Sequence, residues 1–420
     1  MKITSINQKY CLLHNDTIDV ENIKNLTFFR SIAEVRVDGI VSFDYFSKEN
    51  GKKKHVHQFV NRYSALNAYY HPAALMLKKI HIKEEICFHQ LICDALTTGA
   101  SVHHVHEPIG LVRECEVPFS DSLFADMQAH YCRQWHGTGM LYHHEGAFTG
   151  STMCRREPVG KVLISILSSN YTMLASVLES LIFNTYKNHT KIVIGWYGDK
   201  DSYEELLKKM ANINVNGQLL DIVFFQNSNR FNFSTFNNII FNKYAGGFDY
   251  FMLLNDDVEI IKCNFLYEMM YIVENEGASV VGNALFYPSA EYGQRLYQHG
   301  GVMLGDANEM FKHVGKHKSP DKFYLPTREV SAVTFASALI STSVYGRYML
   351  NEDYYGDCND IEFCFRVKKD GGHIWYCANA EMIHRESHTR KNDPSMSGDR
   401  GTLKFVEFFK HDLKRVFNLL

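Results

Sequence analysis

Three polar residues end an apolar run near the middle of the chain. Residues 250–254 read Tyr-Phe-Met-Leu-Leu, and Asn255, Asp256 and Asp257 follow at once. The apolar run predicts a buried parallel strand, and open α/β sheets bind ligands at the carboxyl ends of such strands. Carboxylate oxygens suit Mg²⁺ or Mn²⁺, which usually complete their coordination with substrate phosphates. A strand followed by a simple Asx turn is the alternative interpretation.

Strand and helix patterns alternate on both sides of this site. Apolar runs predict strands at residues 159–167, 191–196 and 221–225, and helical periodicity predicts helices at 171–183, 203–210 and 234–244. The alternation predicts an α/β fold with a mostly parallel, Rossmann-like sheet and helices on both faces. Ser168, Trp196 and Asp256 would then lie together at one edge of the sheet. The first strand is followed by neither a GxGxxG motif nor a P-loop, which disfavours dinucleotide binding.

Several sequence blocks downstream of residue 158 occur in a definite order. They are VLISILSSN at 162–170, NRFNFSTFNN at 229–238, DYFMLLNDDVEI at 249–260, QHGGVMLG at 298–305, DCNDIEFCFR at 357–366 and AEMIHRES at 380–387. In this order the blocks resemble family 2 glycosyltransferases with the GT-A fold. The resemblance implies an inverting, metal-dependent enzyme that transfers a sugar from a UDP-, dTDP- or GDP-linked donor. The implied acceptor is an oligosaccharide or lipid-linked glycan of surface polysaccharide or lipopolysaccharide biosynthesis.

The resemblance also assigns roles to individual residues. Asp257 and Asp256 match the acidic motif that binds Mg²⁺ or Mn²⁺, and His384 matches the histidine that closes the metal or diphosphate site. Asp360 matches the base that takes the proton of the acceptor hydroxyl, with Glu362 as the fallback. The residues expected near the donor are Ser168, Asn170, Trp196, Arg230, Asn237, Asp256 and His299. For each polar residue in this set, loop capping or core packing is the alternative.

Two positions depart from the family pattern. The acidic motif starts with Asn255 rather than Asp, which still leaves two carboxylates for a metal. The family commonly has an Asp at the end of the second strand that reads the nucleobase, whereas this chain has Trp196, Tyr197 and Gly198 before Asp199. Trp196 or Tyr197 could stack on the base instead.

The first 150 residues are harder to interpret. We expect a smaller α+β module with strand patterns near residues 39–43, a polar loop at 46–55, a helix at 72–98, a helical linker at 119–144 and a boundary at 145–157. Parts of it weakly resemble the second half of another glycosyltransferase domain. Too few residues precede that half to form a nucleotide-binding unit. We therefore expect a truncated, non-catalytic module that helps to hold an acceptor or a partner.

Histidines cluster in this N-terminal module, at positions 103, 104, 106, 143 and 144. Strand alternation would place the first three on different faces, and no Cys or acidic partner has the spacing of a metal site. A structural role is therefore the favoured interpretation for all five.

Composition narrows the class of partner. The 420 residues carry a net charge of −3, which gives no indication of nucleic acid as a partner. The sequence shows no secretory signal, no apolar run long enough to span a membrane, and ten cysteines without regular spacing. These features predict a cytoplasmic protein with reduced thiols.

The expected domains are the N-terminal module at 1–150, a catalytic domain at 158–395 and an amphipathic helix at 400–420. In that last helix, apolar residues at helical spacing alternate with lysines. The helix could pack on the core, or lie on the anionic inner face of the membrane, where a lipid-linked acceptor would be found.

Two other functions remain open from the sequence. A non-catalytic glycosyltransferase-like scaffold or glycan-binding module would explain the altered base-reading position and the short N-terminal module, although two acidic motifs argue against it. A metal-dependent nucleotidyltransferase would use the same metal chemistry, but the region of Asp360 together with His384 argues against that.

Overall fold

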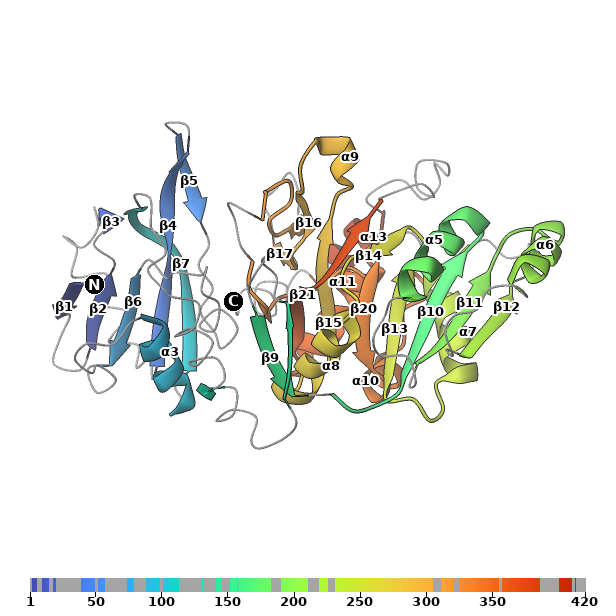
Figure 1. The fold of residues 1–420 in the computed structure, drawn as a ribbon, viewed down its shortest axis with the longest axis horizontal. Coiled ribbons are helices and arrows are strands. Elements are labelled where there is room, and N and C mark those ends of the chain that lie inside the picture. The colour runs from blue at the N-terminus through green and yellow to red at the C-terminus, as the bar shows by residue number, and fades with distance from the viewer. Residues whose placement is uncertain are drawn as a thin grey trace. The chain divides into compact units, whose positions relative to one another are not determined.

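The computed structural model divides the chain into two compact units, Met1–Arg156 and Glu157–Leu420 (Figure 1). The residues it describes are 2–5, 10–14, 18–19, 39–49, 52–56, 74–78, 88–98, 101–112, 130–131, 141–145, 152–156, 158–182, 190–210, 219–225, 231–304, 311–320, 325–354, 357–385, 400–409 and 412. Within this part of the chain no helix is long and apolar enough to cross a membrane.

The first unit is built on one sheet. Its strands are ordered β1 (Lys2–Ser5), β2 (Tyr10–His14), β6 (Ala74–Lys78), β4 (Gly39–Glu49), β7 (Ser101–Val112) and β3 (Ile18–Asp19), and β5 (Lys52–Val56) pairs with β4. Only the β4–β7 pair is parallel. Helix α3 (Phe88–Thr97) buries Ile92, Cys93 and Ala95 completely. The unit is thus a mainly antiparallel α+β module.

Three secondary-structure predictions for this unit were wrong. Residues 74–78, predicted as helix, form β6, because pairing with β2 and β4 overrides their helical pattern. Residues 46–55, predicted as a loop, belong to a β4–β5 hairpin, for which the Asn50-Gly51 dipeptide was a turn signal. The predicted helical linker contains β8 (Leu141–Glu145), which pairs with β9 (Thr152–Arg156) inside the predicted boundary.

A ten-stranded sheet forms the centre of the second unit. Its order is β12 (Leu219–Phe224), β11 (Thr190–Trp196), β10 (Val162–Ser168), β13 (Tyr250–Asn255), β20 (Ser337–Ser341), β15 (Val280–Phe286), β21 (Ile374–His384) and β14 (Val258–Ile260); β16 (Tyr297–His299) pairs with β15 and β19 (Arg328–Glu329) with β21. The four strands from β12 to β13 are parallel, and β20 is antiparallel to both of its neighbours. The predicted α/β class with a mostly parallel sheet is confirmed.

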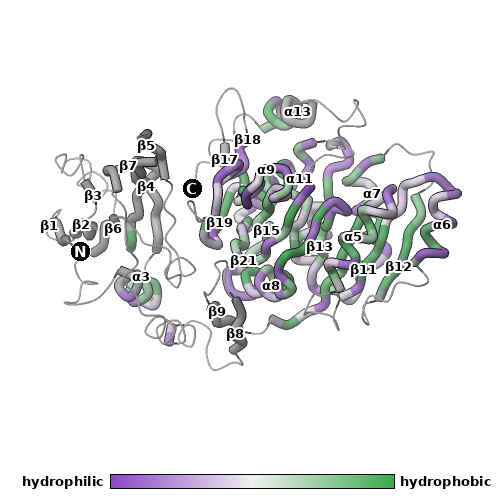
Figure 2. The backbone as a smooth tube through the Cα atoms, turned by 45° about the horizontal axis from the view of Figure 1, so that its top comes forward, coloured by the Kyte–Doolittle hydropathy of each residue, from purple (hydrophilic) through white to green (hydrophobic). Residues whose placement is uncertain are grey.

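Helices cover both faces of this sheet. They are α5 (Tyr171–Ile182), α6 (Lys200–Met210), α7 (Phe233–Tyr244), α8 (Phe265–Glu276), α10 (Thr342–Tyr348) and α11 (Asn359–Lys369). On β13, the Tyr250 hydroxyl donates to Glu274 of α8, whereas the ring of Phe251 packs on Phe241 of α7 and Tyr345 of α10. Successive strand residues point to opposite faces, so α8 lies opposite α7 and α10. The strands they cover are mostly hydrophobic, in contrast to α6 (Figure 2).

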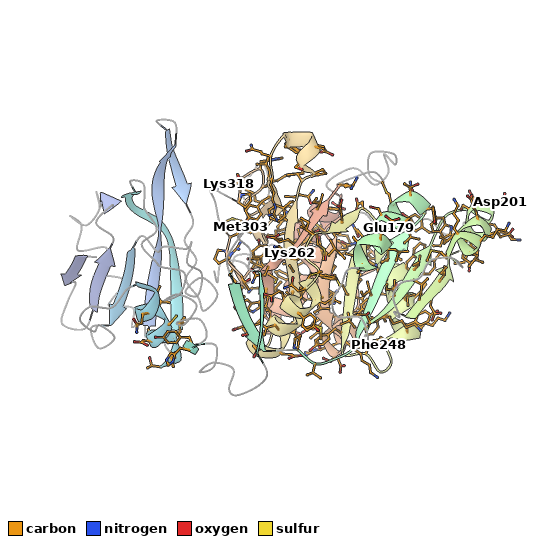
Figure 3. The ribbon with its side chains drawn as sticks, viewed as in Figure 1. Glu179, Asp201, Phe248, Lys262, Met303 and Lys318 are labelled. Atoms are coloured by element: carbon orange, nitrogen blue, oxygen red, sulfur yellow. The ribbon has the colours of Figure 1, made fainter. Side chains whose placement is uncertain are left out.

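The carboxyl ends of five strands share one edge of the sheet. Strands β10, β11 and β13 are parallel, and β15 and β21 run in the same direction because β20 is antiparallel to both β13 and β15. Figure 3 labels Phe248, which lies just before β13 at the amino edge of the sheet, and Lys318, which lies near the opposite end of the second unit. The carboxyl edge therefore gathers the strand ends Ser168, Asn255 and His384.

The segment before α11 is also anchored at this edge. Asn232, which caps α7 just after the carboxyl end of β12, donates from Nδ2 to the carbonyl of Glu352 at 2.9 Å. Ser234 Oγ donates to the carbonyl of Tyr354 at 3.2 Å. In α11 itself, Phe363 packs on Phe335, close to the start of β20. These contacts hold the segment before α11 on α7, and α11 itself beside the start of β20.

Helix α13 (Arg400–Phe409) belongs to the second unit. Phe405 is completely buried, and its ring contacts Phe365 of α11 and Phe311 of β18 (Phe311–His313). Phe409 also packs on Phe365, at 4.6 Å between ring centroids. Phe405 and Phe409 of this helix therefore pack on the protein; the predicted apolar positions after residue 412 lie outside the described residues.

Candidate active site at the carboxyl edge

His384 and Asp257 face each other at the carboxyl edge. The antiparallel pairing of β14 with β21 places Val258 opposite His384, and so brings the preceding Asp257 beside the imidazole. Asp257 Oδ1 lies 3.2 Å from His384 Nε2, and both side chains are 13% exposed. The structure therefore brings together the two residues that the sequence predicted as metal ligands on separate motifs.

Gln298 of β16 holds the other side of the imidazole. Its Nε2 donates to the backbone carbonyl of His384 at 3.2 Å, which sets the orientation of the amide. Its Oε1 lies 2.6 Å from His384 Nδ1. Because an amide oxygen only accepts hydrogen bonds, Nδ1 must carry the proton. Nε2 is therefore the nitrogen directed at Asp257, as a donor in the imidazolium ring and as a lone pair in the neutral ring.

Asp257 Oδ1 and His384 Nε2 share a positive charge at this distance, which either a proton on Nε2 or a metal ion in its place supplies. Asp257 Oδ1 is buried and accepts no hydrogen bond of good geometry. Burial opposes ionisation of Asp257, yet the proximity of His384 outweighs it, so that the pKa of Asp257 is lowered. An ionised carboxylate oxygen and an imidazole lone pair, with the imidazole oriented by an amide, form a typical partial metal site.

The residues therefore fit a divalent metal that takes its remaining ligands from a substrate. Among the described residues, no group of three or more His, Cys, Asp or Glu side chains is arranged to hold a metal by itself. Mg²⁺ and similar ions at phosphate-binding sites use one or two carboxylates plus substrate oxygens, so two protein ligands suffice. The imidazole favours Mn²⁺ over Mg²⁺, since imidazole binds softer metals better than it binds Mg²⁺.

Asp256 is held by the end of β10. Ser168 Oγ donates to Asp256 Oδ2 at 2.6 Å, and Ser168 has no exposed surface. Burial, together with the adjacent charge of Asp257, raises the pKa of Asp256 to about 7 despite this hydrogen bond. Of the two predicted carboxylates, Asp257 is therefore the one that is ionised without a bound cation, and Asp256 becomes fully ionised only above neutral pH.

The two carboxylates predicted as bases differ in their surroundings. Glu362 is 2% exposed, and both its oxygens accept from Arg366, at 2.7 and 2.9 Å. Arg366 also donates to the carbonyls of Tyr348 and Met349. Asp360 is partly exposed in the first turn of α11, where its Oδ1 accepts from the backbone of the next residue at 2.8 Å. Of these two carboxylates, Asp360 is the one with exposed surface, because Glu362 is buried against Arg366.

Two side chains predicted to lie near the donor, those of Asn170 and Asn237, form hydrogen bonds within the fold. Asn170 Oδ1 accepts from the first backbone N–H groups of α5, as a helix cap does. Asn237, 1% exposed, accepts from Ser165 and donates to the carbonyl of Phe233. These two side chains follow the alternative interpretation of loop capping and core packing. Arg230 lies outside the described residues.

Two further residues predicted near the donor, Trp196 and His299, are buried in the structure. Trp196 is 1% exposed, so its ring offers no face for a nucleobase, whereas Tyr197 is partly exposed and packs on Phe231 at 4.4 Å. His299 is 1% exposed, with its Nδ1 2.7 Å from Nδ1 of His313. Burial, then the charges of His313 and Arg328, holds the pKa of His299 well below its usual value. His299 thus packs beneath the edge rather than at its surface.

Gln298 was not predicted from the sequence as a residue of the candidate site. It was part of the QHGGVMLG block, but its partner His384 is 86 residues away. A glutamine has no metal-ligand signature, and only the pairing of β16 with β15 and of β15 with β21 reveals the contact.

Comparison with known proteins gives distant relatives. No family model matches the chain. It is 26% identical over 266 residues to "Uncharacterized protein y4gI" of Sinorhizobium fredii (strain NBRC 101917 / NGR234), covering 61% of this chain and 28% of that protein. It is 25% identical over 175 residues to "O-antigen biosynthesis protein RfbC" of Myxococcus xanthus, covering 40% of this chain and 13% of that protein. The chain thus spans less than a third of either relative.

Solved structures show partial likeness at low identity. GalNAc-T7, solved with UDP, GalNAc and Mn²⁺, is 13% identical with a TM-score of 0.47, over 60% of this chain and 48% of that chain. The mannosyltransferase PcManGT of Pyrobaculum calidifontis, solved with GDP-Man and Mn²⁺, is 9% identical with a TM-score of 0.40, over 64% and 66%. Because both scores are below 0.5, the fold assignment above rests on the strand order alone.

Proposed function

We propose that the second unit is a metal-dependent glycosyltransferase of the GT-A type that transfers a sugar from a nucleotide-sugar donor to a glycan hydroxyl with inversion. The observation that carries the proposal is the pair of possible ligand atoms, Asp257 Oδ1 and His384 Nε2, 3.2 Å apart at the carboxyl edge of the sheet. A divalent cation can replace the proton on Nε2 in this pair, and two protein ligands leave coordination positions for a diphosphate. The sequence blocks that resemble family 2 glycosyltransferases include both residues.

Asp257 and His384 would hold the metal, with Asp256 beside them. Bound there, Mn²⁺ would offset the charge that develops on the donor's diphosphate as the sugar leaves. Ser168 keeps Asp256 in place through its 2.6 Å hydrogen bond. Gln298 keeps the proton of His384 on Nδ1, so that Nε2 remains available as a ligand. Tyr197 is the aromatic side chain with exposed surface at the end of β11, where the base would stack.

Asp360 would accept the proton of the attacking hydroxyl. Its place in the first turn of α11 and its partial exposure support this role, as does the hydrogen bond that ties the preceding segment to Asn232. Glu362 supports this turn through its two hydrogen bonds with Arg366 instead of competing as the base. Direct attack by one activated hydroxyl on the anomeric carbon inverts its configuration.

The acceptor class is proposed from the relative named for O-antigen biosynthesis in Myxococcus xanthus. A surface polysaccharide or lipopolysaccharide oligosaccharide, free or lipid-linked, is therefore the expected acceptor. Among the strands described in the first unit, none ends in an acidic pair, and this unit is proposed to bind no donor and to assist acceptor or partner binding.

A binding screen tests this function. Titration of the whole protein with UDP-, dTDP- and GDP-sugars, with and without Mn²⁺, should give one donor whose binding requires the metal. At about 100 times its dissociation constant, that donor should add about 2.7 kcal/mol to the free energy of unfolding. Asp257→Ala should abolish the metal-dependent part. If no nucleotide sugar binds with any divalent metal, the chain is a scaffold or glycan-binding module instead.

A further inference from the structure

Three aromatic rings that have no part in the proposed chemistry form a cluster near Asp257 and His384. Tyr287 follows β15, Tyr292 ends α9 (Ser289–Tyr292), and His317 lies in a turn after β18. The rings of Tyr287 and His317 are stacked, with centroids 4.8 Å apart and planes at 4°. The Tyr292 ring lies 4.9 Å from Tyr287 and 5.9 Å from His317. We call these three side chains the aromatic platform.

The platform has a buried base and an exposed top. Tyr287 is 5% exposed and supports the other two rings from within. Tyr292 is 41% exposed, one of the few large apolar side chains on the surface of the described residues. His317 is also exposed, although one face of its ring is covered by Tyr287. Two aromatic rings therefore present surface to solvent side by side.

Backbone hydrogen bonds hold the turn that carries His317. His317 N–H donates to the carbonyl of Tyr297 at 2.8 Å, and Tyr297 N–H donates to the carbonyl of Lys318 at 2.9 Å. Lys318 N–H donates to Gly315 at 2.8 Å and closes the turn. The turn is thus tied to β16, the strand that also carries Gln298.

His317 occupies a strained backbone conformation. Its φ is 61°, in the left-handed region where glycine is the usual residue. Non-glycine residues are uncommon there, and such residues cluster at ligand-binding sites. A glycine at this position would relieve the strain but remove the ring. This conformation adds to the hypothesis, argued from the ring contacts, that the ring itself has a role.

The platform adjoins the candidate metal site. Phe286 pairs with Ile383 across β15 and β21, so that Tyr287 and His384 are the next residues on two adjacent strands. Adjacent strands are about 5 Å apart. By contrast, β11, where the nucleobase would stack on Tyr197, is separated from β15 by β10, β13 and β20. Four strand spacings, about 19 Å, lie between them.

The ring faces suit the apolar face of a sugar. Aromatic faces are electron-rich, and the axial C–H groups on one face of a pyranose carry partial positive charge. Recognition sites for small ligands combine such apolar surfaces with a few polar groups, and the Tyr292 hydroxyl can donate to a sugar oxygen. We propose that Tyr292 and His317, supported by Tyr287, form a subsite that stacks on a pyranose ring of the acceptor glycan.

The subsite rests on the proposed function for its biological role, but its binding can be tested without any donor. The probes are the methyl pyranosides of glucose, galactose, mannose and N-acetylglucosamine, added to the whole protein in saturation-transfer difference NMR. We expect transfer to the ring C–H protons of at least one glycoside. Tyr292→Ala and His317→Gly should each weaken its binding roughly 2- to 10-fold, and Tyr292→Phe should retain most of it.

The choice of variants distinguishes loss of ring stacking from disruption of the fold as the cause of weaker glycoside binding. His317→Gly suits the left-handed backbone, so it should not destabilise the turn. Leu207→Ala, at a 43% exposed apolar residue on α6, is the matched control and should bind like the wild-type chain. No transfer to any glycoside, or equal transfer in Tyr292→Ala, would overturn the subsite. Displacement of the glycoside by UDP, dTDP or GDP with Mn²⁺ would assign the rings to the donor and overturn it too. The donor screen can fail while glycoside binding persists, so the two proposals are tested separately.

Discussion

Gln298 and His384 exchange two hydrogen bonds, one at 2.6 Å to the imidazole and one at 3.2 Å to the backbone carbonyl of the histidine. The second bond sets the orientation of the amide, and the first therefore sets the tautomer of the ring. As a result, Nε2 faces the buried oxygen of Asp257 at 3.2 Å. The Gln298 amide, which is not itself a proposed metal ligand, thus orients the imidazole at the candidate metal site.

Replacing Gln298 should weaken metal binding without removing a ligand. In Gln298→Leu the imidazole loses its orientation, and we expect Mn²⁺ affinity to fall about 10- to 100-fold, as for other residues that support metal ligands. Calorimetric titration with Mn²⁺ alone measures this. Gln298→Glu still offers an acceptor to Nδ1 and should retain most of the affinity. Gln294→Leu, at an exposed glutamine on the same segment, is the control; equal affinity in both Leu variants would refute the role of Gln298.

Asp256 should make the metal-free protein less stable as the pH rises. Its pKa is about 7 in the folded chain, whereas the ordinary pKa of an aspartate is 3.8, so the folded chain binds more protons between these values. The free energy of unfolding should then fall as the pH rises from about 4 to about 7. Asp256→Asn removes this titration and should be more stable than the wild-type chain at pH 8, by up to about 4 kcal/mol. The difference should shrink toward pH 4.

Urea unfolding in a chelator at pH 5 and pH 8 measures this effect. Asp199→Asn is a suitable control, because that exposed carboxyl at the start of α6 has a lowered pKa from hydrogen bonds with Ser202. A gain in Asp256→Asn that is the same at both pH values would show that the carboxyl is not buried as described.

Substitutions of Asp360 and Glu362 should have different effects, the first on turnover and the second on stability. Asp360→Asn removes the proposed base but keeps its shape, so turnover should fall about 10²- to 10⁴-fold with little change in donor affinity or in the free energy of unfolding. Steady-state kinetics and thermal unfolding of the same variant measure both. Normal turnover in this variant would exclude Asp360 as the base.

Glu362→Gln should act mainly on stability. It leaves Arg366 with a neutral partner at a buried site, and charge-assisted hydrogen bonds of this kind contribute about 1.5–3 kcal/mol each. Because the Arg366 side chain is 26% exposed, solvent will offset part of the loss. We expect a lower midpoint of thermal unfolding and near-normal turnover per folded molecule. A fully stable but inactive Glu362→Gln variant would move the base to this residue.

The buried ring of Phe405 tests whether α13 is part of the core. Phe405→Ala should cost about 3–5 kcal/mol of unfolding free energy, as for other buried Phe residues, measured by urea unfolding. If its apolar face instead bound a membrane surface, the substitution would leave stability unchanged and reduce binding to anionic phosphatidylglycerol vesicles. Val159→Ala, at a residue that is 73% exposed, is the control.

The sequence predicted the second unit better than the first. In the second unit, apolar strands such as residues 191–196 and amphipathic helices such as 234–244 have unambiguous periods, and the structure places both within a residue of the predicted bounds. In the first unit, the strand at 74–78 reads as helix, because a short apolar run has no period of its own. Its partners lie far away in sequence, so only tertiary pairing determines its conformation.

The candidate site was predictable in its carboxylates and histidine but not in their environment. Asp257 and His384 were expected together from their motifs. The burial of Trp196 and His299 was not, because strand ends are exposed or covered according to the loops that pack on them. The support of His384 by Gln298 depends on strand pairings that no local pattern encodes.

The most direct test of the account is donor turnover with the metal controlled. A panel of UDP-, dTDP- and GDP-sugars would be incubated with the metal-free protein, with and without Mn²⁺, and nucleoside diphosphate release measured by chromatography. We predict release from one nucleotide class, only with a divalent metal, and its loss in Asp257→Ala but not in Asp249→Ala, a carboxyl before the amino end of β13. Equal release in excess chelator, or full activity in Asp257→Ala, would contradict the metal-dependent mechanism.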